Sequence, residues 1–352
     1  MSNYRLAVIF AVSYFILQPT NSSSILNTIK MKLYLREPEP NKLSNDPYRN
    51  SYKEVYLGQA AELLQFMDLQ EITLIHFHGY IQSTDTNDVV DLMQGYLVGT
   101  NYNVIAVDYR DITNLDYLEA VLLVDGVATV MVQTIYDMVA GGMNETKLIL
   151  SGFSMGSQVC GFIGRKLSFQ LSKIIAGDPA GSGFYVLEPS ISASDALCVQ
   201  CIHTDMGWYG HTGPCGHLDF YPNGGVRQQP GCPESFDCMI LIHGGHTPLC
   251  SFGELISACS HNRADKYMAE AARHSEAFPS VECNSWDDFI HGKCDRNVTI
   301  PMGYAAPCSV TGKFYLQTNS RSPFSRGLNG TAYEDYVIRP LSSIIGVESN
   351  CR

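Results

Sequence analysis

A serine stands between two glycines in the stretch "LILSGFSMGSQVCGF", residues 148–162. Apolar, β-favouring residues lead into "GFSMG", with Ser154 at its centre, and the residues that follow are typical of a helix. This pattern is typical of a nucleophile elbow, where flanking glycines let strand and helix pass close to a strained, exposed serine. Glycine and serine are also ordinary turn residues, so the pattern by itself leaves a plain turn open.

A serine hydroxyl is a weak nucleophile near neutral pH and needs a base, itself oriented by a carboxylate. Asp178 is the best candidate for the acid, because it ends the apolar run "IIAG" and is followed by the loop-forming "PAG". His261 is the best candidate for the base, because it follows Cys259 on an expected loop and precedes an expected helix. Ser154, Asp178 and His261 also occur in one of the known chain orders of such triads.

Competing assignments exist for the acid and the base. Asp178 by itself would be an aspartate that starts an ordinary turn. His203 and His217 lie in strand-like or turn-like runs and are expected to be structural. His243 and His246 lie in a glycine-rich loop and are expected to be solvated.

Acyl transfer also needs hydrogen-bond donors where the oxyanion develops. The helix expected after Ser154 offers the backbone N–H of Met155, and the turn "HFHGY" offers that of Tyr80. Gly79 permits a close backbone approach at this turn. A plain strand-to-loop turn would have the same residues.

The elements that must position these groups alternate between strands and helices. The residues between 117 and 139 have apolar side chains at three- and four-residue spacing and predict a crossover helix. Such alternation predicts an α/β fold whose mostly parallel sheet carries helices on both faces and gathers its chemistry at the carboxyl ends of the strands. The expected strands are 31–37, 71–77, 102–109, 146–153, 171–178 and 196–205.

Composition excludes some functions. The 352 residues are 45% hydrophobic and carry a net charge of −12, without the basic cluster that nucleic-acid binding needs.

One arginine precedes an apolar run from Leu6 to Leu17, which predicts a secretory signal peptide of about 20 residues. We expect cleavage between Gln18 and Ser24; a signal anchor is the alternative. No later segment is expected to cross a membrane.

Twelve cysteines all lie from Cys160 onward. Disulfides explain them better than zinc, because the C-x-x-C formed by Cys198 and Cys201 has no spaced partner pair. We expect Cys283 to pair with Cys294 and Cys201 with Cys215, and Cys160 to be a buried free thiol. The expected glycosylation sites are Asn144, Asn297 and Asn329.

The segments "IHFHGY", "LSGFSMGSQVCGFIG", "AGDPAG" and "HLDFYPNGGVRQQPGC…ACSHNRADKYM" occur in the order seen in the pancreatic-lipase-like family. The chain resembles this family over most of residues 30–320; the family includes insect neutral lipases, phospholipases A1 and yolk-protein relatives. The resemblance implies an α/β-hydrolase fold, a triad of Ser154, Asp178 and His261, and an oxyanion hole from Met155 and Tyr80. Phe153 stands where the family commonly has histidine. The C-terminal β-sandwich of the vertebrate lipases is expected to be absent, which leaves one catalytic domain over residues 25–352.

The resemblance also implies that Cys232 and Cys259 close the base of a lid over residues 233–258. Cys238 and Cys250 lie inside this segment and are expected to pair with each other. Its apolar run "MILI" is expected to face lipid, although packing on the domain is the alternative. The facing loop, 204–217, is short, as in family phospholipases.

The expected activity is a secreted serine carboxyl-ester hydrolase that acts on lipid at a membrane or emulsion surface. A long lid with a short facing loop favours triacylglycerol lipase activity with phospholipase A1 side activity. No metal or cofactor is expected to take part, and no nucleic-acid partner. The alternative is a non-catalytic yolk-type or lipid-binding relative, which loss of a triad residue would indicate; all three residues are present.

Overall fold

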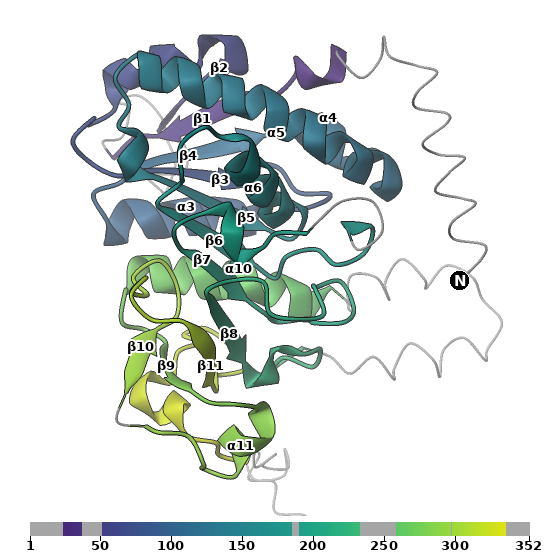
Figure 1. Cartoon of the computed structure of the whole chain (residues 1–352), viewed down its shortest axis with the longest axis vertical. Coiled ribbons are helices and arrows are strands. Elements are labelled where there is room, and N and C mark those ends of the chain that lie inside the picture. Colours follow the sequence, from purple (N-terminus) through teal and green to yellow (C-terminus); the bar gives the residue numbers. More distant parts are fainter. Residues whose placement is uncertain (1–23, 37–50, 185–189, 233–257, 297, 336–352) are drawn as a thin grey trace, which may run out of the picture.

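The structure is a computed structural model that describes residues 24–36, 51–184, 190–232, 258–296 and 298–335. The leader, the run "MILI", the cysteines Cys238 and Cys250 and the glycan acceptor Asn297 lie outside these residues. All strands of the described part belong to one sheet with the order β10-β9-β11-β8-β7-β6-β5-β3-β4-β1-β2 (Figure 1).

The middle of the sheet is parallel, as the sequence predicts, although two of its strands, at 218–222 and 312–316, were not among those expected. It comprises β4 (Asn103–Asp108), β3 (Thr73–Phe77), β5 (Leu148–Phe153), β6 (Lys173–Gly177), β7 (Val199–Ile202), β8 (Leu218–Pro222) and β11 (Gly312–Leu316). Both edges are antiparallel: β1 (Lys30–Tyr34) and β2 (Tyr52–Tyr56) on one side, and β9 (Pro279–Glu282) and β10 (Thr299–Pro301) on the other.

Helices cover both faces of this sheet. One face carries α5 (Tyr117–Ala140), α6 (Met155–Lys166) and the 3-10 helix η1 (Leu57–Phe66), and the other carries α3 (Asn87–Gly99) and α10 (Cys259–Arg273). Neighbouring strand residues point to opposite faces: Ile75 and Phe77 pack in the core below α5, whereas Leu74 packs in the core below α3. The short helices α4 (Arg110–Thr113) and α11 (Trp286–Ile290) follow β4 and β9.

Helix α5 is long and apolar enough to cross a membrane by length and composition, which the sequence analysis expected of no segment after the leader. Half of its most apolar stretch is buried, and the helix packs on α6 and η1. A helix with these contacts needs apolar side chains for the core of the domain.

Strand register brings the expected reactive residues to one edge. Phe77 of β3 lies opposite Gly152 of β5, and Phe153 lies opposite Gly177 of β6. The residue that follows each of these strands therefore leaves the sheet at the same carboxyl edge: His78, Ser154 and Asp178. This is the edge where α/β folds place ligands.

Candidate active site

Ser154 occupies a strained elbow between β5 and α6. Its φ of 54° and ψ of −119° are unusual for a residue with a side chain. A Cβ at Gly152 would lie 2.4 Å from the backbone of Gly156, and one at Gly156 would lie 2.0 Å from the carbonyl oxygen of Phe77. The two glycines are therefore required by packing. The Ser154 side chain is only 6% exposed, although the elbow pattern predicts an exposed serine.

Ser154, His261 and Asp178 form a hydrogen-bonded chain. His261 Nε2 lies 2.8 Å from Ser154 Oγ, and His261 Nδ1 lies 2.6 Å from Asp178 Oδ2. The other Asp178 oxygen, Oδ1, accepts backbone N–H groups from Thr204 at 2.8 Å and Asp205 at 3.1 Å. These two donors leave Oδ2 for the imidazole, so Nδ1 carries the proton and Nε2 can accept one from the serine.

His261 lies in the first turn of α10 and not on a loop, because the helix begins at Cys259. The disulfide between Cys232 and Cys259 holds the start of this helix. The His261 side chain is 10% exposed. Its ring packs beside the rings of Phe153 and Tyr209, with centroid distances of 4.7 and 5.5 Å. Helix and disulfide together fix its orientation.

The two backbone segments expected to stabilise an oxyanion are in contact. Gly79 approaches the Phe153 ring so closely that a Cβ there would lie 2.8 Å from it. Gly156, in the first turn of α6, touches the carbonyl groups of Phe77 and His78. The turn that contains Tyr80 therefore packs against the elbow and the start of α6, where Met155 lies; the oxyanion role of the two N–H groups stays a prediction.

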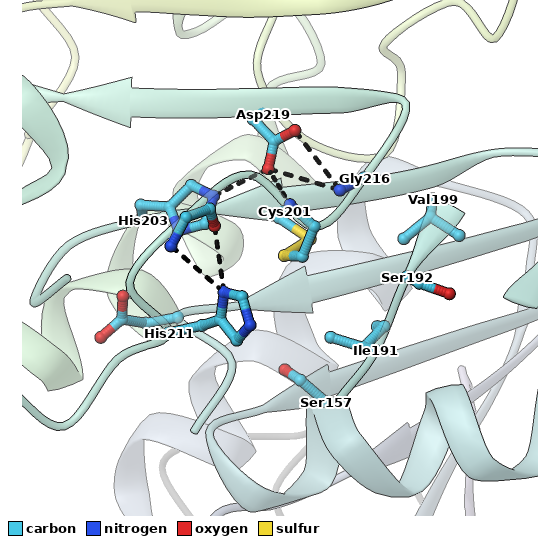
Figure 2. Close-up of a disulfide and its surroundings, with 12 residues drawn as sticks. Ser157, Ile191, Ser192, Val199, Cys201, His203, His211, Gly216 and Asp219 are labelled. Atoms are coloured by element: carbon cyan, nitrogen blue, oxygen red, sulfur yellow. Dashed lines mark hydrogen bonds and ion pairs between the residues drawn. A yellow bond between two sulfur atoms is a disulfide. The ribbon is translucent and has the colours of Figure 1, made fainter. Parts of the chain in front are cut away.

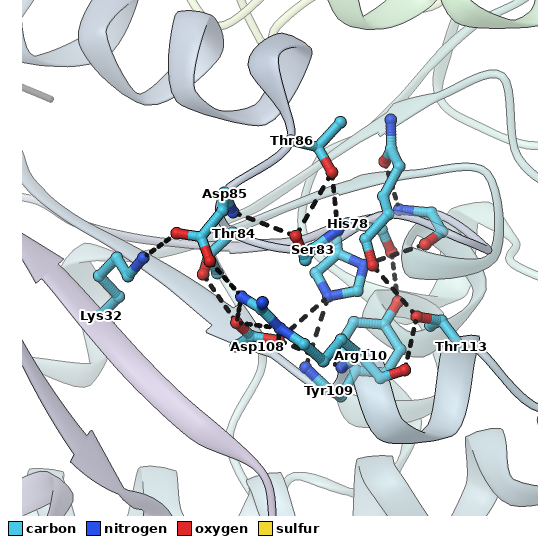
Figure 3. Close-up of polar contacts among 12 residues, drawn as sticks. Lys32, His78, Ser83, Thr84, Asp85, Thr86, Asp108, Tyr109, Arg110 and Thr113 are labelled. Atoms are coloured by element: carbon cyan, nitrogen blue, oxygen red, sulfur yellow. Dashed lines mark hydrogen bonds and ion pairs between the residues drawn. The ribbon is translucent and has the colours of Figure 1, made fainter.

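His78 holds the turn that contains Gly79 and Tyr80 against Tyr109. Its Nδ1 donates to the Gly79 carbonyl at 2.9 Å, its Nε2 faces the Tyr109 N–H at 3.4 Å, and its ring stacks on Tyr109 (Figure 3). Burial lowers the pKa of His78 to about 4, so it is neutral at physiological pH. Burial would raise the pKa of the nearby Asp108, but hydrogen bonds from Arg110 and Thr84 outweigh it and lower the value to about 2.

An ion pair between Arg227 and Asp205, which was not expected from the sequence, supports the loop behind Asp178. Arg227 donates from Nε and from its terminal nitrogen to the two oxygens of Asp205, both at 2.8 Å. Its guanidinium lies over the rings of Trp208 and Tyr209. Arg227 is some twenty positions away in a loop without periodicity, so no sequence pattern points to this pair.

Two other expected histidines have structural contacts. His203 Nε2 lies 2.8 Å from Asp219 Oδ1 beside the Cys201–Cys215 disulfide (Figure 2), and His217 Nδ1 accepts the N–H of Val199. The potential ligand atoms of Cys201, His203, Cys215 and Asp219 all lie within 4.8 Å of one another. The two sulfurs are bonded to each other, so the thiolates that a metal would take are not available. His243 and His246 lie outside the described residues.

Four disulfides join cysteines of the described part. Three of them, Cys201–Cys215, Cys232–Cys259 and Cys283–Cys294, are pairs that the sequence analysis named. The fourth, Cys198–Cys308, spans 110 positions, and no local spacing indicates it. Cys160 is a buried free thiol. Asn144 and Asn329 of the expected glycan acceptors are exposed.

The comparisons with known proteins agree on one family. A sequence model of the family described as "Lipase" matches residues 26–324. Lipase member H of Oryctolagus cuniculus is 31% identical over 64% of the chain and 46% of its own length. Phospholipase A1 member A of Pongo abelii is 31% identical over 72% and 56%, and pancreatic lipase-related protein 2 of Mus musculus is 29% identical over 73% and 56%. The chain spans about half the length of these relatives.

Solved structures match over shorter parts of the fold. Esterase PE8 is 20% identical with a TM-score of 0.30, covering 39% of this chain and 69% of its own. MGS-M1, an alpha/beta hydrolase from a deep-sea metagenome library, is 12% identical with a TM-score of 0.32, covering 52% and 66%.

Proposed function

The chain belongs to the lipase family, and from this premise we propose that it is a secreted serine hydrolase that cleaves carboxyl esters of lipids. The carrying observation is the hydrogen-bonded chain from Ser154 through His261 to Asp178 at the carboxyl edge of the sheet. A nucleophile, a base and an orienting acid within hydrogen-bond distance are what acyl transfer requires.

The proposed reaction proceeds through an acyl-enzyme. Ser154 Oγ attacks the ester carbonyl carbon while His261 Nε2 takes the hydroxyl proton, and Asp178 stabilises the imidazolium. The N–H groups of Met155 and Tyr80 stabilise the oxyanion. His261 then gives its proton to the leaving alcohol, and water attacks the acyl-enzyme with His261 again as base, which releases the fatty acid and restores Ser154. Every proton in this sequence moves through His261.

An apolar substrate is supported by the side chains around the site. Ile81, next to Tyr80, is 68% exposed, and Trp208, next to the Tyr209 that packs on His261, is 63% exposed. We propose that these two apolar side chains contact the acyl chain of the substrate. The relatives are named as lipases and as phospholipases A1, so we propose these two ester classes. The lid proposed over residues 233–258 rests on the sequence resemblance.

Secretion is proposed from the leader-like N-terminus and is supported by four disulfides. The same disulfide-rich scaffold would suit a non-catalytic lipid-binding relative. The intact Ser154–His261–Asp178 geometry favours the enzyme.

The test is hydrolysis by the purified protein and by Ser154→Ala on four substrates: triacylglycerol emulsion, phosphatidylcholine vesicles, galactolipid and a short soluble ester. We expect the parent to hydrolyse the soluble ester and at least one lipid, with the rate on the lipid rising sharply above its solubility limit. Ser154→Ala should lose this activity. An inactive parent that still binds vesicles would support the lipid-binding alternative, and an active Ser154→Ala would refute the assignment of the nucleophile.

A further inference from the structure

The turn from Gly79 to Gln82 is strained at a β-branched residue. Ile81 has a φ of 58°, in the left-handed region that such side chains disfavour. Main-chain bonds support the turn: the Ile81 N–H donates to the Thr113 carbonyl at 3.2 Å, and the Gln82 N–H donates to the Gly79 carbonyl at 3.3 Å. Strained backbone persists only where surrounding contacts over-determine it, and it is common at active sites.

The Gln82 side chain adds two hydrogen bonds that hold the turn in place. Its Oε1 accepts the Gly79 N–H at 2.7 Å, and its Nε2 donates to Asp265 Oδ2 at 3.0 Å. The Gly79 N–H can only donate, so the amide oxygen must face it and the amide nitrogen must face Asp265. Gln82 therefore has one orientation that serves both partners.

Asp265 lies on α10, four positions after His261 and on the same side of the helix. Its side chain is fully buried, and its Oδ1 has no hydrogen-bond partner among the described residues. Burial raises the pKa of Asp265 to about 8, so at neutral pH it is mostly an uncharged acid that presents an acceptor to Gln82. A buried carboxyl without an ion-pair partner is costly, which indicates that its contact with Gln82 has a use.

We propose that Gln82 and Asp265 are positioning residues that couple the oxyanion turn to the helix that carries the catalytic base. The bridge from Gly79 through Gln82 to Asp265 joins the segment of Tyr80 to the segment of His261. It sets the distance between the oxyanion donor of Tyr80 and the base His261, which are 181 positions apart in the sequence. This proposal rests on the proposed function, because it assigns a role to residues that act through Tyr80 and His261.

The test measures kcat and KM on p-nitrophenyl butyrate, a soluble ester, for the parent, Gln82→Met, Asp265→Leu and the double variant. Gln82→Met keeps the side-chain length and removes both hydrogen bonds. We expect each single variant to lower kcat at least about tenfold with KM within about twofold, since the lost alignment matters in the transition state. The double variant should be no worse than the poorer single variant, because both remove one bridge. Asp265→Asn, which keeps an acceptor oxygen, should restore most of the kcat lost in Asp265→Leu.

A matched control lies at the opposite end of the strands. Asn103 is also a buried amide that bridges two segments, with Nδ2 on the Asp68 carbonyl at 2.8 Å and Oδ1 on the Asp68 N–H at 2.9 Å. Asn103→Ala should lower the melting temperature and leave kcat within about twofold, because it removes hydrogen bonds far from the reacting groups. Should Gln82→Met fail to fold, Gln82→Asn replaces it; its shorter side chain cannot reach both partners and should lower kcat as well.

Three results would overturn the coupling. They are an unchanged kcat in folded Gln82→Met or Gln82→Asn, single-variant losses that multiply in the double variant, and an equal kcat loss in Asn103→Ala. Each of these three results requires an active parent and an inactive Ser154→Ala variant, so each would leave the proposed function intact. A parent without esterase activity would instead refute the proposed function.

Discussion

Replacing Asp178 by asparagine should reverse the proton pattern of His261. The Asp178 Oδ1 accepts two backbone N–H groups, from Thr204 and Asp205, whereas Oδ2 faces His261 Nδ1 at 2.6 Å. An asparagine must keep its oxygen toward the two N–H donors, so its NH₂ group faces Nδ1. Nδ1 must then be unprotonated, the proton moves to Nε2, and Nε2 can no longer accept the proton of Ser154 at 2.8 Å.

The expected loss is large. In a serine-protease triad the same exchange lowers kcat by about 10⁴-fold, which corresponds to roughly 5 kcal/mol of transition-state stabilisation. The measurement is kcat on a soluble ester at neutral pH, with the melting temperature as a check on folding. KM should change little, because Asp178 acts on the base and not on the bound ester.

Asp219 provides a matched control. It is also buried, accepts backbone N–H groups and lies 2.8 Å from a histidine, His203. Asp219→Asn should destabilise the fold and leave kcat nearly unchanged, because His203 has no role in the proposed reaction. A kcat within tenfold of the parent in Asp178→Asn, or an equal loss in Asp219→Asn, would refute the reasoning about the tautomer.

Three further changes probe the scaffold. Gly156→Ala places a Cβ 2.0 Å from the Phe77 carbonyl oxygen. We therefore expect the free energy of unfolding in urea to fall by roughly 1–3 kcal/mol and kcat to fall tenfold or more. An unchanged kcat would mean that the elbow tolerates a larger separation between α6 and the end of β3. Replacing Cys232 and Cys259 by serine opens a bridge across 27 positions, which should cost about 3–4 kcal/mol of unfolding free energy by the chain-entropy argument; a loss below about 1 kcal/mol would contradict it. Burial raises the pKa of Asp265 to about 8 against the opposing effect of the hydrogen bond from Gln82, with smaller effects from Asp88, which raises it, and Lys266, which lowers it. The folded protein therefore holds a proton that the unfolded chain releases near pH 4. The contribution of Asp265 to the free energy of unfolding should therefore fall by on the order of 5 kcal/mol as pH rises from about 4 to 8. The parent should lose stability over this range relative to Asp265→Asn; a stability difference between the two proteins that does not change with pH would contradict the assignment.

The central strands and the reactive edge could be predicted from sequence because buried parallel strands are short apolar runs. The expected strands 71–77, 146–153 and 171–178 match β3, β5 and β6 to within two residues at each end. Strands β2, β8, β9, β10 and β11 were not among those expected from the sequence. Strand β2 lies at an edge, and its sequence "YKEVY" includes charged and exposed residues.

Contacts between distant segments could not be predicted from the sequence. The Cys198–Cys308 disulfide and the Gln82–Asp265 hydrogen bond join positions more than a hundred residues apart, with no shared pattern. The burial of Ser154 and the helical position of His261 depend in the same way on packing that local sequence does not encode.

The most direct test of the central claim is covalent labelling by a fluorophosphonate, which reacts with a serine only when a neighbouring base activates it. We expect rapid, stoichiometric modification that mass spectrometry maps to the peptide containing Ser154. Labelling should vanish in Ser154→Ala and persist in the control Ser168→Ala, whose serine is exposed and away from the elbow. Labelling that survives Ser154→Ala, or that maps to another serine in the folded protein, would contradict the assignment of Ser154 as the nucleophile.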